Sequence, residues 1–265
     1  MAGLTVDEVR GVLLDIDGVL VTSWRPLPGA ADSLSALRRA GLSLRFLTNT
    51  TAKSGREIVV ALNEVGVAID ADELITAGRI TADYLTSRFP GARCLVLNDG
   101  SDEDMDRAGV VRTDDTDAEV VVIGSGGPSF SWERLNVALR CLTRGAALVA
   151  MHGSKSWMTD QGPCLDAGAY VSMLVAAAGG VSPVTIGKPA PAMFDAAIES
   201  MRMDPRHLVM VGDDVQNDVL AAGSVGVRGI LVRTGKFRPQ ADRLARTNSI
   251  AVIDSIADLP AAIGF

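Results

Sequence analysis

Short apolar runs alternate with longer amphipathic segments at the start of the chain. VLLDI (12–16) is an apolar run that ends at a turn, as expected for a strand buried on both faces of a parallel sheet. Residues 28–41 predict a helix, because two leucines share one face and a glycine stands where the helix should end. SLRFLT (43–48) predicts the next strand, and SGRE (54–57) has the spacing of a capping box before another helix. The pattern is therefore β-α-β-α.

The last third of the chain repeats this alternation. Strands are predicted at 184–186, 207–212 and 229–234, and helices at 191–201 and around 219–222. Strands that alternate with helices indicate a doubly wound parallel sheet with right-handed crossovers.

Three further strands are predicted in the middle of the chain, at 93–98, 118–124 and 146–151, with helical patterns between them. Neither flank alone makes a full sheet, so one domain split by an insertion is favoured over three tandem domains. We therefore expect an α/β core domain from residues 1–77 and 183–265, and a smaller inserted α/β domain over residues 78–182.

Composition and charge narrow the possible partners. The three cysteines among 265 residues lack CxxC spacing, which argues against a disulfide framework or a thiolate zinc site and favours a reduced, cytoplasmic setting. A net charge of −7 without a basic stripe argues against nucleic acid. The longest apolar stretch, from Ala169, is too short and too broken by glycine to span a bilayer, so no membrane partner is expected.

Chemically reactive side chains gather directly after the predicted strands. Ligands of open parallel sheets bind at the carboxyl ends of the strands, so residues that follow different strands are expected to converge there. The candidates in this position, or just before the helix at 191, are Asp15, Asp17, Thr48, Asn49, Lys188, Asp213, Asp214 and Asp218.

Such a cluster indicates a phosphoryl-handling site. Gathered carboxylates repel each other unless a cation neutralises them, and oxygen ligands without His or Cys favour Mg²⁺. Magnesium usually shares its ligand shell with a substrate phosphate, which would explain a lysine and a threonine hydroxyl at the same place. A turn at Gly18 lets Asp15 and Asp17 diverge, so that one carboxylate attacks and the other transfers a proton.

Four motifs carry a resemblance to a known superfamily. DIDGV (15–19), LTN (47–49), GKP (187–189) and GDDVQND (212–218) resemble, in order and spacing, the motifs of the haloacid dehalogenase superfamily of aspartate-nucleophile phosphatases. The long gap between the second and third motifs resembles the NagD-like group, which inserts an α/β cap into a Rossmann-like core. The resemblance implies a small phosphorylated metabolite as substrate and allows a homodimer.

The resemblance also implies a role for each motif residue. Asp15 would be the nucleophile that forms an aspartyl-phosphate, and Asp17 would protonate the leaving group and then activate water. Thr48 would hydrogen-bond the phosphoryl group, and Asn49 would position either that group or the Asp15 loop. Lys188 would offset the negative charge of the phosphoryl group and of Asp15. Magnesium would be held by Asp15, the Asp17 main-chain carbonyl and Asp213, with either Asp214 or Asp218 acting through water.

One segment of the inserted domain is a candidate for substrate selection. Residues 152–168 are polar and rich in glycine between a strand and a helix, which predicts a loop of the kind that carries function. His152, Lys155 and Asp166 are candidate substrate contacts; the alternative for His152 is a structural or solvated loop histidine.

Several functional alternatives stay open at this stage. The segments FLTNTTAKSGRE and VRTGKFRP are most similar to a branch of the group that hydrolyses pyrophosphate and phosphoamides. Several members of that branch lack an aspartate equivalent to Asp17, which this sequence keeps, so ordinary phosphomonoester hydrolysis is favoured. Carbon–halogen hydrolysis is disfavoured because it needs no metal, and carbon–phosphorus hydrolysis because it needs a Schiff-base lysine from a different cap. The alternative from another class is a non-catalytic phosphometabolite-binding or sensor protein.

Overall fold

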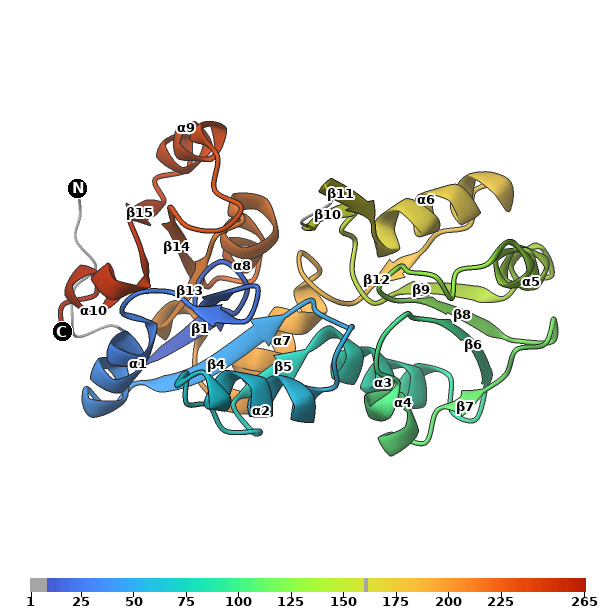
Figure 1. The fold of residues 1–265 in the computed structure, drawn as a ribbon, viewed down its shortest axis with the longest axis horizontal. Helices are drawn as coiled ribbons and strands as arrows, with labels where there is room; N and C mark the ends of the chain where they lie inside the picture. The colour runs from blue at the N-terminus through green and yellow to red at the C-terminus, as the bar shows by residue number, and fades with distance from the viewer. Residues whose placement is uncertain (1–8, 160–161) are drawn as a thin grey trace. The chain divides into compact units, whose positions relative to one another are not determined.

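The computed structural model describes residues 9–159 and 162–265 and divides them into two compact units (Figure 1). The described part of the first unit comprises residues 9–48, 56–75 and 188–265. The second comprises residues 49–55, 76–159 and 162–187. Each unit is an α/β structure with its own sheet, which matches the expected fold class.

The sheet of the first unit has the strand order β15-β14-β13-β1-β4-β5. The central strand β1 pairs in parallel with β4 on one side and with β13 on the other. β13, β14 and β15 continue the parallel pairing. β5 and β15 were not predicted from the sequence. The bounds are β1 Gly11–Asp15, β4 Ser43–Thr48, β5 Leu74–Thr76, β13 Leu208–Gly212, β14 Arg228–Val232 and β15 Ala251–Ile253, with a short hairpin of β2 Val21–Thr22 and β3 Arg25–Pro26.

α1, α2, α7 and α8 lie where helices are predicted from the sequence, whereas α9 and α10 were not predicted. α1 buries Leu34 and Leu37 on one face, and Gly41 follows it with a φ of +78°, a conformation that glycine adopts without steric cost. No helix in the described part of the chain is both long and apolar enough to cross a membrane. The bounds are α1 Ala30–Arg39, α2 Gly55–Glu64, α7 Pro191–Met201, η2 Pro205–His207, η3 Val215–Leu220, α8 Ala221–Ser224, α9 Pro239–Thr247, η4 Ile256–Asp258 and α10 Leu259–Ala262.

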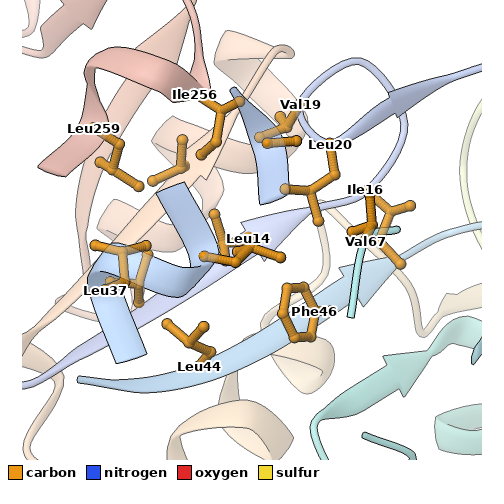
Figure 2. Close-up of a cluster of buried hydrophobic side chains, with 14 of the residues drawn as sticks. Leu14, Ile16, Val19, Leu20, Leu37, Leu44, Phe46, Val67, Ile256 and Leu259 are labelled. Atoms are coloured by element: carbon orange, nitrogen blue, oxygen red, sulfur yellow. The ribbon is translucent and has the colours of Figure 1, made fainter. Parts of the chain in front are cut away.

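Strand β1 is buried on both faces. Alternate residues of this segment, including Leu14 and Ile16, belong to one hydrophobic cluster, and strand geometry turns the equally buried Leu13 to the opposite face. Figure 2 shows Leu14 among Leu37 of α1, side chains of β4 and residues from the end of the chain. This packing fixes the end of β1, and with it the position of Asp15.

The second unit has the strand order β12-β9-β8-β6-β7, paired in parallel. The sequence pattern groups residues 184–186 with the core, but β12 pairs with β9, so the second unit continues to Gly187. Its strand bounds are β6 Arg93–Leu97, β7 Val111–Arg112, β8 Val120–Ile123, β9 Ala147–Ala150 and β12 Val184–Thr185. Its helices are α3 Ala77–Arg88, α4 Glu103–Arg107, α5 Trp132–Thr143 and α6 Ala167–Ala177.

The prediction of a loop over residues 152–168 is wrong in part. Within it, β10 (Ser156–Thr159) and β11 (Gly162–Leu165) form an antiparallel hairpin, and α6 begins at its end. The polar and glycine-rich composition marks turns, but the strands are defined by hydrogen bonds to each other, which one strand's residue pattern does not reveal.

Residues 49–55 also pack within the second unit. Thr51 Oγ1 donates to Asn98 Oδ1 at 3.1 Å and lies 2.8 Å from Ser125 Oγ. The Ser125 main-chain N–H donates to the same Thr51 oxygen at 3.0 Å. This buried network joins the segment after β4 to the carboxyl ends of β6 and β8.

Candidate active site

A lysine lies between two buried carboxylates at the carboxyl edge of the first sheet. Asp15 is the last residue of β1, and Lys188 Nζ donates to its Oδ1 at 2.5 Å. The same Nζ lies 2.7 Å from Asp218 Oδ1 and 3.5 Å from the Leu47 carbonyl oxygen. Lys188 is 4% exposed and Asp15 is 7% exposed, so this ion pair is largely removed from water.

Asp213 and Asp218 come from the segment that follows β13. Asp213 directly follows the strand, and the η3 turn brings Asp218 back toward the same edge. Asp15, Asp213 and Asp218 each offer one carboxylate oxygen, and these oxygens lie within 4.8 Å of one another. All three side chains are buried.

The two oxygens of Asp213 have different surroundings. Its Oδ2 accepts a hydrogen bond from the main-chain N–H of Lys236 at 2.6 Å. Gly18 and Gly235 both approach this oxygen so closely that a Cβ on either would lie 2.0 Å from it. Its Oδ1 is buried and has no hydrogen-bond partner among the described residues. One oxygen is therefore fixed by the protein, and the other is available to a ligand.

Burial raises the pKa values of the clustered carboxyl groups. Burial, followed by the charges of Asp15 and Asp218, raises the pKa of Asp213 to about 8. Burial raises the pKa of Asp218 to about 6, although Lys188 opposes this shift. It also raises the pKa of Asp15 despite the attraction of Lys188. For Lys188 itself, burial lowers the pKa, but the carboxylates of Asp15 and Asp218 raise it further, so its pKa lies above the ordinary value.

These residues fit a divalent cation. A buried carboxylate oxygen without a donor is costly, and a metal ion would supply the missing interaction. The cluster offers oxygen ligands alone, which are the ligands that Mg²⁺ prefers. The charge of a bound cation would also favour the ionised form of Asp15, Asp213 and Asp218, whose pKa values burial raises.

Asp17 and Asp214 are placed differently from the cluster. Asp17 is partly buried and forms an isolated bridge with Val21 after β1, so the two aspartates of DIDG differ in exposure. Asp214 caps the turn that follows it: its Oδ1 accepts from the main-chain N–H groups of Gln216 and Asn217 at 3.0 Å. The sequence left open whether Asp214 or Asp218 belongs to the proposed metal site. The structure brings Asp218 into the cluster.

The remaining candidates lie on both units. Thr48 ends β4 in the first unit and is buried. Asn49 lies in the second unit, where its Oδ1 closely approaches Gly187. His152 and Lys155 also belong to the second unit, and Lys155 is exposed.

His152 lies beside the start of α6. It is buried, and its Nε2 is 3.7 Å from Asp166 Oδ1, the oxygen that accepts from the Ala167 N–H. This contact agrees with the alternative interpretation of His152 as a structural residue that packs against the start of α6.

Lys236 is a residue of the site that sequence reasoning missed. It lies in the loop after β14, and its charge interacts with the carboxylates of Asp15 and Asp213, which raise its pKa although burial lowers it. In the same loop, the Thr234 hydroxyl donates to the Gly18 carbonyl oxygen. The signal was present, because Lys236 follows a predicted strand just as Asp15 and Asp213 do.

Comparison with known proteins agrees with this geometry. A model described as haloacid dehalogenase-like hydrolase matches residues 12–127, and a second, described as HAD-hydrolase-like, matches residues 185–259. The chain is 32% identical over 257 residues to the phospholysine phosphohistidine inorganic pyrophosphate phosphatase of Rattus norvegicus, a match that covers 94% of this chain and 92% of the relative. The chain belongs to the haloacid dehalogenase-like hydrolase family. The matched regions contain the segments that carry Asp15, Lys188, Asp213 and Asp218.

Solved structures of this hydrolase family have the same fold. The p-nitrophenyl phosphatase from Archaeoglobus fulgidus superposes with a TM-score of 0.88 at 25% identity, covering 96% of this chain and 99% of that one. NagD from the K-12 strain of E. coli superposes with a TM-score of 0.82 at 26% identity, covering 94% and 98%. These matches support the NagD-like assignment within the family.

Proposed function

We propose that this hydrolase is a magnesium-dependent phosphatase that cleaves a small phosphorylated metabolite through an aspartyl-phosphate on Asp15. Phosphatase activity itself is supported by the family and by relatives that are named as phosphatases. The observation that carries the rest is the contact of Lys188 with both Asp15 and Asp218 beside the unpartnered oxygen of Asp213. The buried carboxylate of Asp15 lies next to the Lys188 ammonium group and to Asp213, whose free oxygen could bind a metal ion. This arrangement suits attack of Asp15 on a phosphoryl group.

The residues divide the chemistry among them. Asp15 attacks phosphorus, and Lys188 offsets the negative charge of the attacking carboxylate and of the phosphoryl oxygens. The hydroxyl of Thr48 positions the phosphoryl group at the end of β4. Asp17, which is more accessible than Asp15, protonates the leaving oxygen and then removes a proton from the water that cleaves the aspartyl-phosphate.

Magnesium has a specific set of proposed ligands. Asp15, the Asp17 main-chain carbonyl and Asp213 would hold the ion. Asp218, which forms an ion pair with Lys188, would act on the ion indirectly. When bound, Mg²⁺ would neutralise charge on the phosphoryl oxygens and align them for attack.

Removal of metal should abolish activity. After treatment with EDTA, we expect hydrolysis of p-nitrophenyl phosphate to stop and to return when Mg²⁺ is added. Magnesium should also raise the melting temperature, because it binds the folded cluster and not the unfolded chain. The matched variant Asp213→Asn should lose both responses, whereas the exposed control Asp32→Asn should keep them. Full activity in EDTA would contradict the proposed metal role.

Replacement of Asp17 tests the proton transfer. Asp17→Asn should lower kcat by about 100-fold for alkyl phosphates, whose leaving oxygen is strongly basic and needs a proton. The loss should be clearly smaller for p-nitrophenyl phosphate, because nitrophenolate leaves without protonation. Steady-state kinetics on the two substrate types measures this difference. An equal loss on both would argue against a general acid at this position.

A second candidate function is hydrolysis of pyrophosphate or phosphoamides. The specific observation that favours it is the 32% identity to a relative named for phospholysine, phosphohistidine and inorganic pyrophosphate. The presence of Asp17 favours phosphomonoesters, whose leaving oxygen requires an acid. Comparison of kcat/KM across sugar phosphates, phosphoamino acids, phosphoramidate and pyrophosphate decides between them. A protein that binds such compounds without turnover would instead be a sensor.

A further inference from the structure

A hollow of about 230 Å³ lies in the first unit beside Asp213. Its walls come from three places: the residues that follow β13, the loop after β14 and the first turns of α9. It is too small for a large organic group but has the size for a carboxylate or a phosphate with a few carbon atoms. The lining residues are Asp213, Asp214, Val215, Gln216, Lys236, Arg238, Gln240, Ala241 and Leu244.

Two cationic side chains of this hollow form no close ion pair with a described carboxylate, although the charges of Asp15 and Asp213 act on one of them, Lys236. Among the described residues, no carboxylate forms an ion pair with Lys236 or Arg238, whereas the nearby Arg233 pairs with Asp242 and Asp254. Both cations are solvent-accessible, so each can meet a ligand.

The acidic groups next to these cations accept hydrogen bonds from nitrogen donors, except at Asp213 Oδ1, which has no such donor among the described residues. The oxygens of Asp214 accept from Gln216 and from both the main-chain and side-chain nitrogens of Asn217. Asp213 Oδ2 accepts from the Lys236 N–H. Within the hollow, the side chains of Lys236 and Arg238 therefore offer positive charge and donors directly beside the carboxylate cluster.

We propose that this hollow binds a second anionic group of the substrate, through Lys236 and Arg238. The inference rests on the proposed function, since a phosphoryl group attacked by Asp15 beside an ion on Asp213 would lie near the hollow, which Asp213 lines. The preferred substrates are then small phosphorylated compounds that carry a carboxylate or another phosphate within a few bonds of the reacting phosphorus. The apolar side chains of Val215 and Leu244 accommodate the short carbon segment between the two groups.

A matched pair of substrates tests this preference. Phosphoglycolate carries a carboxylate where 2-hydroxyethyl phosphate carries a neutral hydroxymethyl group. We expect kcat/KM to be about tenfold higher for the anionic ester, the effect of one or two charge-assisted hydrogen bonds. Arg238→Gln should remove most of this preference, and the exposed control Arg243→Gln on α9 should preserve it. Lys236→Gln should lower both values, but the anionic ester more.

A binding experiment separates this inference from the proposed function. Calorimetry with magnesium and the Asp15→Asn protein compares methylenediphosphonate, which has two anionic groups, with methylphosphonate, which has one. Loss of the difference in affinity on Arg238→Gln supports the subsite, even if no ester is hydrolysed and the phosphatase proposal fails. Equal affinity for both probes, or equal losses for both on Arg238→Gln, would overturn the subsite.

Discussion

Replacement of Asp15 by asparagine should abolish turnover while the fold is retained. Asn has nearly the same shape as Asp but cannot attack phosphorus, so we expect kcat for p-nitrophenyl phosphate to fall by at least about 10⁴-fold. Stability should change little, by no more than about 4 °C in melting temperature. The reason is that the ionised carboxylate is itself costly to bury, as its raised pKa shows, and Lys188 keeps Asp218 as a partner.

Detection of the covalent intermediate makes this test specific. Acid quenching of the wild-type protein with a phosphorus-labelled substrate should leave label on the chain, and Asp15→Asn should carry none. The matched control Asp32→Asn changes an exposed aspartate of α1 and should behave as the wild type. If Asp15→Asn kept appreciable activity or label, another residue would be the nucleophile.

The central part of the candidate site could be predicted because its chemistry follows strand ends. β1 and β13 are short apolar runs buried on both faces, and β4 is buried over its last three residues; such runs are recognisable from sequence. Asp15 and Asp213 lie at or just after the ends of two of these strands, so parallel pairing brings them to one edge. The approach of Lys188 could not be derived from its surroundings in the sequence alone, because a lysine before a proline is most often at the surface.

Other parts of the structure depend on contacts that one sequence does not display. β12 is a two-residue strand, and only its partner β9 decides which unit it joins. The β10–β11 hairpin is defined by cross-strand hydrogen bonds and not by an alternating pattern. Asp214 and Asp218 both occur in GDDVQND, but only the geometry of η3 shows that one caps the turn while the other enters the cluster. The hydrophobic pattern of a sequence identifies helices and strands, but contacts between distant residues decide which sheet a strand joins and which side chains enter the site.

The two aspartates of DIDG are unequal for a structural reason. Asp15 ends a buried strand and is held by Lys188, whereas Asp17 lies past it and is only partly buried. Gly18, with a φ of +88°, turns the chain directly after Asp17 and leaves room for Asp213. A nucleophile needs a fixed position, and a proton-transfer group needs access to the leaving oxygen and to water. The arrangement agrees with the division of roles that we propose.

Lys188→Met should impair both stability and catalysis. In the absence of magnesium, the substitution leaves Asp15 and Asp218 buried without their cation, and we expect a loss of about 3–5 kcal/mol in the free energy of unfolding at neutral pH. kcat should fall by about 10³-fold or more, since the phosphoryl oxygens lose a fixed positive charge. Chemical denaturation and steady-state kinetics measure the two effects.

The pH dependence of this loss has a definite sign. Burial already raises the pKa of Asp218 to about 6 with Lys188 present, and without the lysine this pKa should rise further. A carboxyl group whose pKa is higher in the folded than in the unfolded protein favours folding when protonated. The variant should therefore be least destabilised near pH 4 and lose stability as pH rises through 6 and beyond. A loss that is constant across this range would show that packing of the lysine chain, and not its charge, is responsible.

A double variant separates the two consequences of removing Lys188. Lys188→Met combined with Asp218→Asn removes one of the two uncompensated carboxylates, so it should recover part of the stability lost in the single variant. Magnesium should stabilise the single variant as well, because a bound cation supplies positive charge beside Asp15 and Asp213. Activity should recover in neither case, since neither restores a cation at the position of Lys188 Nζ. Recovery of turnover in the double variant would mean that Lys188 acts only to keep the carboxylates folded in place, and that the phosphoryl charge is offset elsewhere.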